Sequence, residues 1–472
     1  MTLSDLTIGD LAAVAALLVL TAGSCLVIVV DLVARPAARP LAWLGATVGA
    51  GAAATAVLVG SGTAGFGGAV IRDPGTVFFT VLIGVVTSAA LLVSTETLRR
   101  DALPAGEYVA LVLFSAAGGT LMVASGDLLV LFLGLELLSL PLYVLTAMLR
   151  AQEHGDEGAL KYFLLGAAAS AVLLYGIALL YAATGTLRLE ALGRATADPL
   201  YLAGLALLLG GLAFKAALVP FHAWAPDAYE SAPTPVTAQM AVVAKVAAFV
   251  AILRLVAATG RAPLARVDWE VALAVIAAAT LVVATLSALG QRSVKRLLAY
   301  SSIAHAGYLA IAVAATGATS GPAVAFYLAV YAAGTFGAFA VLSLLSTDDP
   351  TVADLAGLWR RRPLLVVVLA VFLFGLTGLP PTAGFLAKVY VFEAALRAQL
   401  LWLVVLGVIA SVVSAAYYLR VLFACLAADD GGPDTTPRAR VATGVVVLTA
   451  VLVVAVGFVP QPLLDAAALV RF

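Results

Sequence analysis

Three lysines and one glutamate lie inside apolar stretches that should carry no charge. Lys215, Lys245 and Lys388 each fall well within such a stretch, and Glu136 lies in DLLVLFLGLELLSLPLY. A charge at the centre of a bilayer costs at least about 2.5–3.5 kcal/mol, so such residues face a protein interior or a wet cavity and indicate function. Only five of the 26 Lys and Arg residues are Lys, yet all three inside these stretches are Lys. Arginine cannot release its proton whereas a buried lysine can, so the pattern predicts proton transfer.

Glu136 and Lys245 reach similar depths in their stretches. Glu136 follows Asp127 by nine residues, which at about 1.5 Å per residue places it about 14 Å into its helix, near the middle of a membrane. Lys245 follows Pro235 by ten residues and reaches the same depth. A carboxylate and a lysine side by side stabilise each other's charge. We therefore expect Glu136 to pair with Lys215.

His305 adds a third kind of titratable group, about ten residues into the stretch that opens with KRLLAYSSIAHAGY. Histidine titrates near pH 6.5 and can pass protons between partners. Because it lies between Lys245 and Lys388 in the sequence, we expect it to bridge them. Other interpretations stay open: the lysines cap carbonyls at a helix break or extend to the membrane surface, Glu136 forms a static ion pair, and His305 is an ordinary core residue.

Prolines interrupt two of the apolar stretches. Pro220 lies in GLAFKAALVPFHAWAPDAYE, and Pro380 and Pro381 lie in FLFGLTGLPPTAGFLAKVYVFEA. Proline has no N–H and displaces the carbonyl four residues before it, and freed backbone at membrane depth is tolerated only inside protein or beside water. Two broken helices at matching places indicate an internal repeat with an ion site at its interface. After the first break, His222 is a candidate for the proton entry or for hydrogen bonding to the freed carbonyls, and Asp227 and Glu230 are candidates for the entry or ordinary loop acids.

The composition is that of a polytopic membrane protein. Hydrophobic residues make up 63% and charged residues 11% of the 472, and the mean hydropathy is +1.11, against about 45–50% apolar and about 25% charged in soluble proteins. Cys25 and Cys425 are far apart, and no iron–sulfur, Walker or Rossmann motif is present, so we expect no redox cofactor or nucleotide site in this chain. The stretches long enough to cross a membrane predict about fourteen helices, near 10–31, 41–60, 77–97, 107–125, 127–148, 160–184, 200–219, 234–257, 270–289, 296–317, 323–345, 364–392, 400–425 and 438–459.

The positive charges predict the orientation of the chain. The N-terminus, MTLSDLTIGD, lacks the basic region of a signal peptide, so we expect the first helix to be retained. An even number of spans puts both termini on one side of the membrane. Fifteen Lys and Arg residues fall on the opposite side in this topology and eight on the side of the termini. Because cytoplasmic loops carry the excess of positive charge, both termini are expected outside the cytoplasm.

The run FKAALVPFHAWAPDAYESAPTPVTA, followed by Lys245, closely resembles the signature of the antiporter-like membrane subunits of NADH:quinone oxidoreductase (complex I) and of Mrp-type cation/proton antiporters. The resemblance extends from about 107 to 425. It implies an all-α polytopic membrane protein with two inverted five-helix repeats, each containing a broken helix. The implied domains are helices 1–3 in residues 1–106, helices 4–8 in 107–257, helices 9–13 in 258–425 and helix 14 in 426–472.

The same resemblance implies a proton path in a bacterial cell (inner) membrane. The path runs from Lys215, paired with Glu136, through Lys245 and His305 to Lys388. FMN, iron–sulfur clusters and quinone belong to partner subunits, and the expected partners are other membrane-arm subunits, including other antiporter-like ones, and lipid, with no nucleic acid. Lys388 stands where a related subunit is expected to have Glu, and about thirteen residues follow the last expected helix, too few for the long lateral helix of the largest subunit. Both features favour the N-type antiporter-like subunit of such a complex.

Two competing functions remain. The first is a subunit of an Mrp-type sodium/proton antiporter, whose motifs overlap with those above, and sodium-dependent exchange without NADH would favour it. The second is a scaffold that only holds other subunits together. In that case, replacing Lys215 in an assembled complex would leave proton pumping intact.

Overall fold

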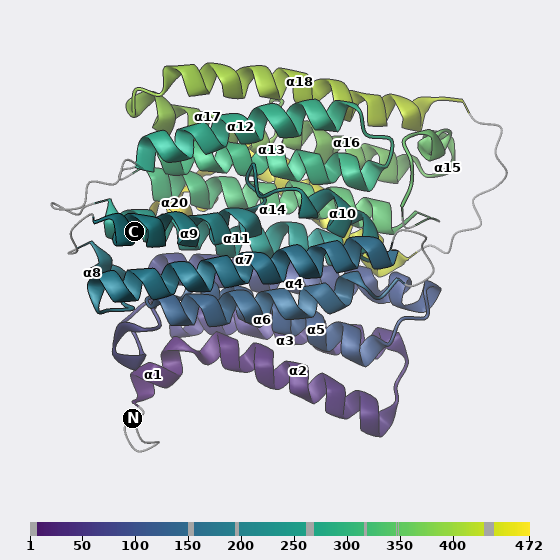
Figure 1. Ribbon diagram of the computed structural model, residues 1–472. Coiled ribbons are helices and arrows are strands. Elements are labelled where there is room, and N and C mark those ends of the chain that lie inside the picture. The colour runs from purple at the N-terminus through teal and green to yellow at the C-terminus, as the bar shows by residue number, and fades with distance from the viewer. Residues whose placement is uncertain are drawn as a thin grey trace.

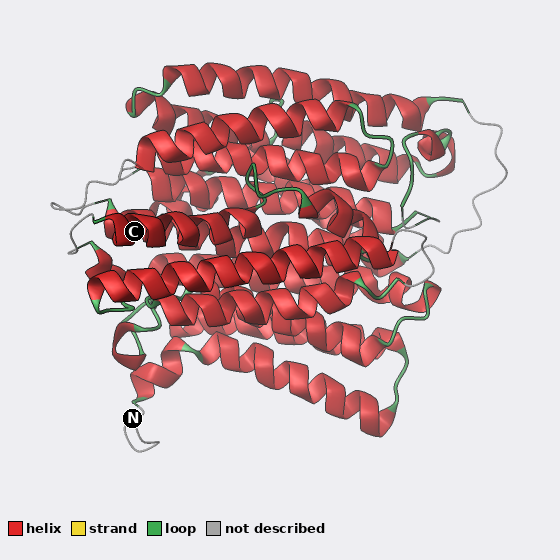
Figure 2. Ribbon diagram, in the orientation of Figure 1, coloured by secondary structure: helices red, strands yellow, loops and turns green. Residues whose placement is uncertain are grey.

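The computed structural model describes residues 7–149, 155–193, 198–260, 269–315, 319–345, 347, 349–428 and 439–472. The described residues form helices joined by loops and turns (Figure 2). Thirteen of these helices are long and apolar enough to cross a membrane. The expected all-α, polytopic membrane fold is therefore confirmed.

The helices follow one another along the chain with short connections. Those in the first half are α1 (Ile8–Ala13), α2 (Ala15–Ala34), α3 (Ala38–Val59), η2 (Phe66–Gly68), α4 (Pro74–Arg100), α5 (Ala105–Val123), α6 (Leu128–Thr146), α7 (Gly155–Thr184), α8 (Leu189–Leu192), α9 (Pro199–Ala216), α10 (Trp224–Ser231) and α11 (Thr234–Thr259). Those in the second half are α12 (Trp269–Leu289), α13 (Val294–Ala314), α14 (Ser320–Ser343), η3 (Ala353–Leu355), α15 (Leu358–Arg361), α16 (Pro363–Thr377), α17 (Ala383–Arg397), α18 (Leu401–Leu426), α19 (Arg440–Phe458) and α20 (Gln461–Ala468).

Both predicted breaks are present. The stretch expected at 364–392 is divided into α16 and α17 around Pro380 and Pro381, and together these two pieces make a fourteenth crossing beside the thirteen long helices. The stretch that contains Pro220 is divided into α9 and the short α10. The prediction of about fourteen crossings is confirmed.

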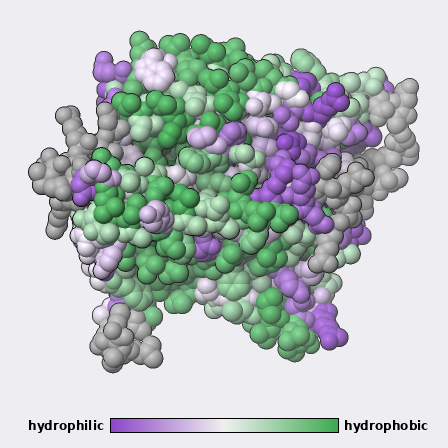
Figure 3. Space-filling model, in the orientation of Figure 1, coloured by the Kyte–Doolittle hydropathy of each residue, from purple (hydrophilic) through white to green (hydrophobic). Residues whose placement is uncertain are grey.

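The helices run side by side, and α1 and the C-terminal residues lie at the same end of the bundle (Figure 1). On the face shown in Figure 3, apolar residues cover the middle, and hydrophilic residues gather most densely at the end that contains α10 and α15. Helices α11, α13 and α14 form the centre, because 94%, 94% and 89% of their most apolar stretches are buried, compared with 22% for α2. Lys245 and Arg254 on α11 and Lys295 on α13 are therefore buried inside the protein.

Two consecutive blocks of five crossings each can be marked out in the chain. The first block runs from α5 to α11 and the second from α12 to α18, and each contains one broken helix. Successive crossings alternate in direction, so an odd number of crossings makes the second block run opposite to the first. The predicted division into inverted repeats is compatible with this order and stays a prediction.

A buried ion pair joins the N-terminal helices to the centre. Arg254, near the end of α11, donates to both carboxylate oxygens of Asp73 at 2.8 and 3.0 Å, to the Thr76 hydroxyl and to the Val123 carbonyl. Asp73 also caps α4 by accepting from the backbone N–H of Thr76. Burial raises the pKa of Asp73, but the Arg254 charge and these hydrogen bonds outweigh it, so the pKa lies below 3.8.

We predict that Arg254→Met destabilises the purified protein by about 3–5 kcal/mol, because it leaves the Asp73 charge buried without its partner. The measurement is the free energy of unfolding in detergent. Asp73→Asn combined with Arg254→Met should recover part of the loss. The matched control is Arg397→Ala, which breaks an exposed pair with Glu393 and should cost no more than about 1 kcal/mol.

The pair also sets a pH dependence. A carboxyl whose pKa is lowered by folding contributes stability that is complete above its unfolded-state pKa and is lost as the pH falls through its folded-state pKa. The contribution of Asp73 should therefore disappear only below about pH 4. A loss from Arg254→Met no larger than that from Arg397→Ala would contradict this role.

Candidate functional site

The first break exposes carbonyls that side chains then satisfy. Helix α9 ends because Ala217 adopts a left-handed conformation (φ 58°), which turns the chain away from the helix axis. The indole N–H of Trp224 donates to the Phe214 carbonyl at 2.8 Å, and Lys245 Nζ donates to the Ala216 carbonyl at 3.0 Å. Lys245 comes from α11 in the centre of the bundle and is 1% exposed. A buried lysine thus caps the broken end of a neighbouring helix.

Lys215 lies in the last turn of α9, one residue before Ala216. Its Nζ donates to the Ser139 hydroxyl at 2.9 Å and to the Tyr162 hydroxyl at 3.1 Å. The Tyr162 ring stacks on the Trp224 ring with 4.5 Å between centroids. Trp224 follows the break, so a residue of the break positions the hydroxyl that accepts from Lys215. The negative end of the α9 dipole also favours a cation at this place.

Glu136 was predicted to pair with Lys215, and this pairing stays a prediction. No hydrogen bond or ion pair joins the two residues, although their charges are near enough to interact. Ser139, one turn beyond Glu136 on α6, takes the place of the carboxylate as the partner of Lys215. Glu136 Oε1 is buried without a hydrogen-bond partner. A buried carboxylate oxygen in that state is a place where an ordered water would be stabilising.

The second break repeats the arrangement of the first. Helix α16 ends at Thr377 because Gly378 adopts a left-handed conformation (φ 86°), where a Cβ would lie 2.8 Å from Lys388 Cδ. Lys388 Nζ donates to the Thr377 carbonyl at 2.7 Å and to the Ser411 hydroxyl at 2.9 Å. It also lies 4.5 Å from the centroid of the Tyr308 ring, within range of a cation–π interaction.

His305 lies between the two breaks, on the central helix α13. Its Nδ1 is 2.7 Å from the Tyr327 hydroxyl, and its ring is 5.4 Å from that of Tyr331 and 5.9 Å from that of Tyr308. The charges of Lys245 and Lys388 both act on it. The Tyr308 hydroxyl is 2.7 Å from Ser411, which accepts from Lys388. Both lysines are thus near enough for their charges to act on His305, and its role as a bridge between them stays a prediction.

Capping and proton transfer are compatible roles for these lysines. A protonated lysine has three N–H donors and a neutral amine has two, so either form can donate to the freed carbonyl. The side chain can therefore keep its position while its charge changes. Burial in an apolar bundle disfavours the charged form, and the freed carbonyls favour it. These opposing effects suit a group that must gain and lose a proton.

The three candidate residues after the first break lie in different environments. Asp227 and Glu230 both accept from Arg296 at 2.7 Å, and Asp227 also pairs with Lys161 at 3.1 Å. These ion pairs tie α10 to α7 and α13, which fits a structural role for both acids. His222 is half-buried, and its Nδ1 is buried without a hydrogen-bond partner.

The tyrosine hydroxyl groups of the site were not predicted from the sequence. No role was predicted for the buried tyrosines around Lys215, His305 and Lys388. A signal was present, because polar residues recur at spacings of three and four in helices that are otherwise apolar. They are Ser302, His305 and Tyr308 on α13, and Tyr327 and Tyr331 on α14.

Comparison with known proteins agrees with this geometry. A curated relative, NADH-quinone oxidoreductase subunit N from Trichlorobacter lovleyi, is 42% identical over 81% of this chain and 80% of its own length. A chain of respiratory complex I from Thermus thermophilus is 40% identical and superposes with a TM-score of 0.83 over 96% of this chain and 99% of that one. A chain of the Mrp complex from Dietzia sp. has a TM-score of 0.86 at 22% identity, covering 98% of this chain and 97% of that one, which shows a shared fold.

A match to a protein-family model shows the family of the chain. The model described as NADH:quinone oxidoreductase/Mrp antiporter, transmembrane, matches residues 125–414, which include both breaks and all five predicted relay residues. Together with the relative at 42% identity, this match places the chain in that family. The chain belongs to the NADH:quinone oxidoreductase and Mrp antiporter transmembrane family.

Proposed function

We propose that the chain is an N-type, proton-translocating subunit of the membrane arm of a bacterial NADH:quinone oxidoreductase. The observation that carries the proposal is the row of buried titratable groups at the two breaks. Each lysine donates a hydrogen bond to a hydroxyl or to a freed carbonyl. His305 contacts the Tyr327 hydroxyl on the central helices. The name of the relative at 42% identity supports the N type.

In this proposal the proton path has two halves. A proton reaches Lys215 near Glu136, passes to Lys245 at the same break, crosses to His305 and leaves by way of Lys388. Both lysines lie at the end of α9, because Lys245 Nζ donates to the carbonyl of Ala216, the residue that follows Lys215. A change of charge at Glu136 alters the protonation of Lys215 because the two charges interact. Through this interaction, a change of charge in an adjacent membrane-arm subunit that acts on Glu136 would be passed on to Lys215.

NADH oxidation and quinone reduction take place in partner subunits, which carry FMN and iron–sulfur clusters. Among the residues that the structure describes, no group of three or more His, Cys, Asp or Glu side chains is placed to hold a metal ion. The relay acts on protons alone, so the energy for pumping reaches this chain from its partners. Both termini face away from the cytoplasm, as the Lys and Arg distribution predicts.

The exposed breaks support assembly with membrane partners. Pro220 and Phe221 at the first break are exposed, and so are Leu379, Pro380 and Pro381 at the second. Irregular backbone at membrane depth does not face lipid, because its polar groups have no partners there. Neighbouring subunits that cover both breaks satisfy this requirement. A chain that acted alone would leave these groups in contact with lipid.

The Mrp-type sodium/proton antiporter is the second candidate. The likeness to the Mrp chain is in fold, at 22% identity, whereas the likeness to the complex I chain includes 40% identity. The identities therefore favour the oxidoreductase. Sodium-dependent proton exchange in vesicles, in the absence of NADH, would reverse this preference.

We predict that Glu136→Gln and Lys215→Ala each reduce proton uptake coupled to NADH oxidation by roughly 10²-fold or more, since each removes a group that must change charge. The measurement is acidification of inverted membrane vesicles, with assembly of the complex checked by native electrophoresis. The matched control is Glu393→Gln, which neutralises an exposed acid on α17 and should leave pumping unchanged. Normal pumping by assembled Lys215→Ala would support the scaffold function instead.

We further predict that Lys245→Arg assembles normally but pumps poorly. Arginine keeps the positive charge and can donate to the Ala216 carbonyl, yet it cannot release a proton. The variant therefore separates the capping role from the relay role. Thermal stability of the assembled complex should stay near the wild-type value, while proton uptake per NADH falls. Wild-type pumping with arginine at this position would show that Lys245 only caps the break.

A further inference from the structure

The proposed relay has a gap between Lys245 and His305. Lys245 donates to the Ala216 carbonyl, and His305 Nδ1 is engaged with the Tyr327 hydroxyl. No hydrogen bond joins the two residues, although the charge of Lys245 acts on His305. Protons move between groups that are linked by hydrogen bonds, so some further group must connect them.

A small cavity beside His305 does not supply that link. A cavity of about 10 Å³ beside His305 is lined by Tyr327, Tyr331 and residues of the second break. Its size is close to the minimum for one water, and its walls are almost wholly apolar. A water needs two to four polar partners, so apolar cavities of this kind stay empty. The connection is therefore expected to come from a side chain.

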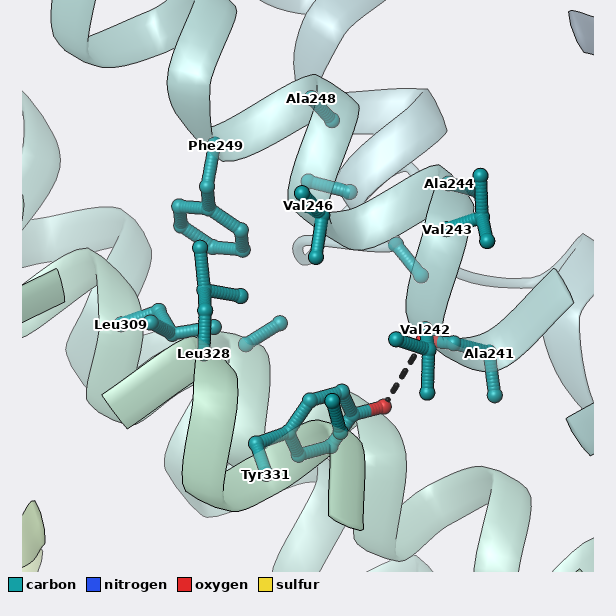
Figure 4. Packing of buried hydrophobic residues seen from close by; sticks show 14 of the residues in the cluster. Ala241, Val242, Val243, Ala244, Val246, Ala248, Phe249, Leu309, Leu328 and Tyr331 are labelled. Carbon is teal, nitrogen blue, oxygen red and sulfur yellow. Dashed lines mark hydrogen bonds between the residues drawn. The ribbon is translucent and has the colours of Figure 1, made fainter. Parts of the chain in front are cut away.

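Tyr331 lies near His305 and between the helices that carry the two relay groups, with 5.4 Å between its ring and that of His305. It lies on α14, one turn beyond Tyr327, between α11 and α13. Its hydroxyl is 2.7 Å from the Ser302 hydroxyl on α13 and donates to the Ala241 carbonyl on α11 at 3.0 Å, as Figure 4 shows for Ala241. Ala241 lies one turn before Lys245, and Ser302 lies one turn before His305. The Tyr331 hydroxyl thus connects the helix of one relay group to the helix of the next.

The hydrogen bonds of Tyr331 have a defined direction. A carbonyl only accepts, so the single proton of the Tyr331 hydroxyl points to Ala241, and the Ser302 hydroxyl must donate to Tyr331. A proton cannot pass onward through the Ala241 carbonyl. The structure therefore holds Tyr331 in an orientation that blocks transfer. Rotation of the hydroxyl away from Ala241 frees its proton for another acceptor.

We propose that Tyr331 is a proton carrier between Lys245 and His305, and that its hydrogen bond to Ala241 is the closed position of a gate. In the open position, the Lys245 ammonium gives a proton to the Tyr331 oxygen while the original hydroxyl proton passes to the imidazole of His305. One O–H bond forms and one breaks, so Tyr331 is neutral before and after. Lys245 ends as a neutral amine and His305 as an imidazolium. The inference rests on the proposed function and adds one residue to it.

The first test is Tyr331→Phe, which keeps the ring and removes only the hydroxyl. In the assembled complex we expect proton uptake coupled to NADH oxidation to fall by about tenfold or more, as for loss of a proton-transfer group. The matched control is Tyr201→Phe, which removes a buried hydroxyl that donates to the Leu192 carbonyl near the membrane surface. The control should pump like the wild type.

The second test separates proton transfer from packing. A fluorinated tyrosine at position 331 keeps the hydroxyl and its hydrogen bonds but makes the phenol more acidic. If Tyr331 carries protons, the pH profile of pumping should move to lower pH. An unchanged profile would show a structural hydroxyl and would overturn the proposal. This variant also decides the question if Tyr331→Phe fails to assemble.

Lys215→Ala, measured in the same vesicles, distinguishes failure of the Tyr331 gate from failure of the proposed proton-pumping function. If Lys215→Ala stops pumping while Tyr331→Phe pumps normally, the gate is refuted and the proposed function stands. If both variants pump normally, the proposed function itself is refuted. If both fail to pump and Tyr201→Phe does not, the proposal is supported.

Discussion

A broken helix inside a membrane leaves carbonyls that must find donors, and in this protein buried lysines provide them. Lys245 donates to Ala216 at the first break, and Lys388 donates to Thr377 at the second. An unsatisfied polar group in an apolar medium costs several kcal/mol, so each break requires its lysine. The same lysine is a titratable group held at a fixed place. Structure and proposed function thus depend on one hydrogen bond at each break.

The breaks also explain how distant parts of the chain come together. Lys245 belongs to the central helix α11 but caps α9, so it brings the interior of the bundle to Lys215. Lys388 shares Ser411 with Tyr308, whose ring faces His305. Hydroxyl groups therefore lie next to Lys215, His305 and Lys388. Such groups pass protons without bringing further charges into the membrane, which keeps the row compatible with an apolar bundle.

Some of this arrangement could be predicted from the sequence. The depth of Glu136 and Lys245, the two proline breaks and the use of Lys rather than Arg follow from chain length and elementary chemistry, and the structure has the breaks where they were expected. The partners of the lysines could not be predicted. Glu136 was expected to pair with Lys215, and their charges do interact, but Lys215 Nζ donates its hydrogen bond to Ser139, one turn further along α6. Which of the two groups faces α9 depends on how the two helices pack, and sequence spacing alone does not decide this. The tyrosines were overlooked because helix periodicity alone does not tell a polar core position from a relay position.

The central claim is that these buried groups form one connected path for protons. The most direct test is an experimental map of the chain within its complex, at a resolution that shows ordered water. The account predicts water or hydroxyl groups within hydrogen-bonding distance of Glu136 Oε1 and between each neighbouring pair from Lys215 to Lys388. A map in which apolar side chains fill the space between any neighbouring pair, with no polar group or water to connect them, would contradict it.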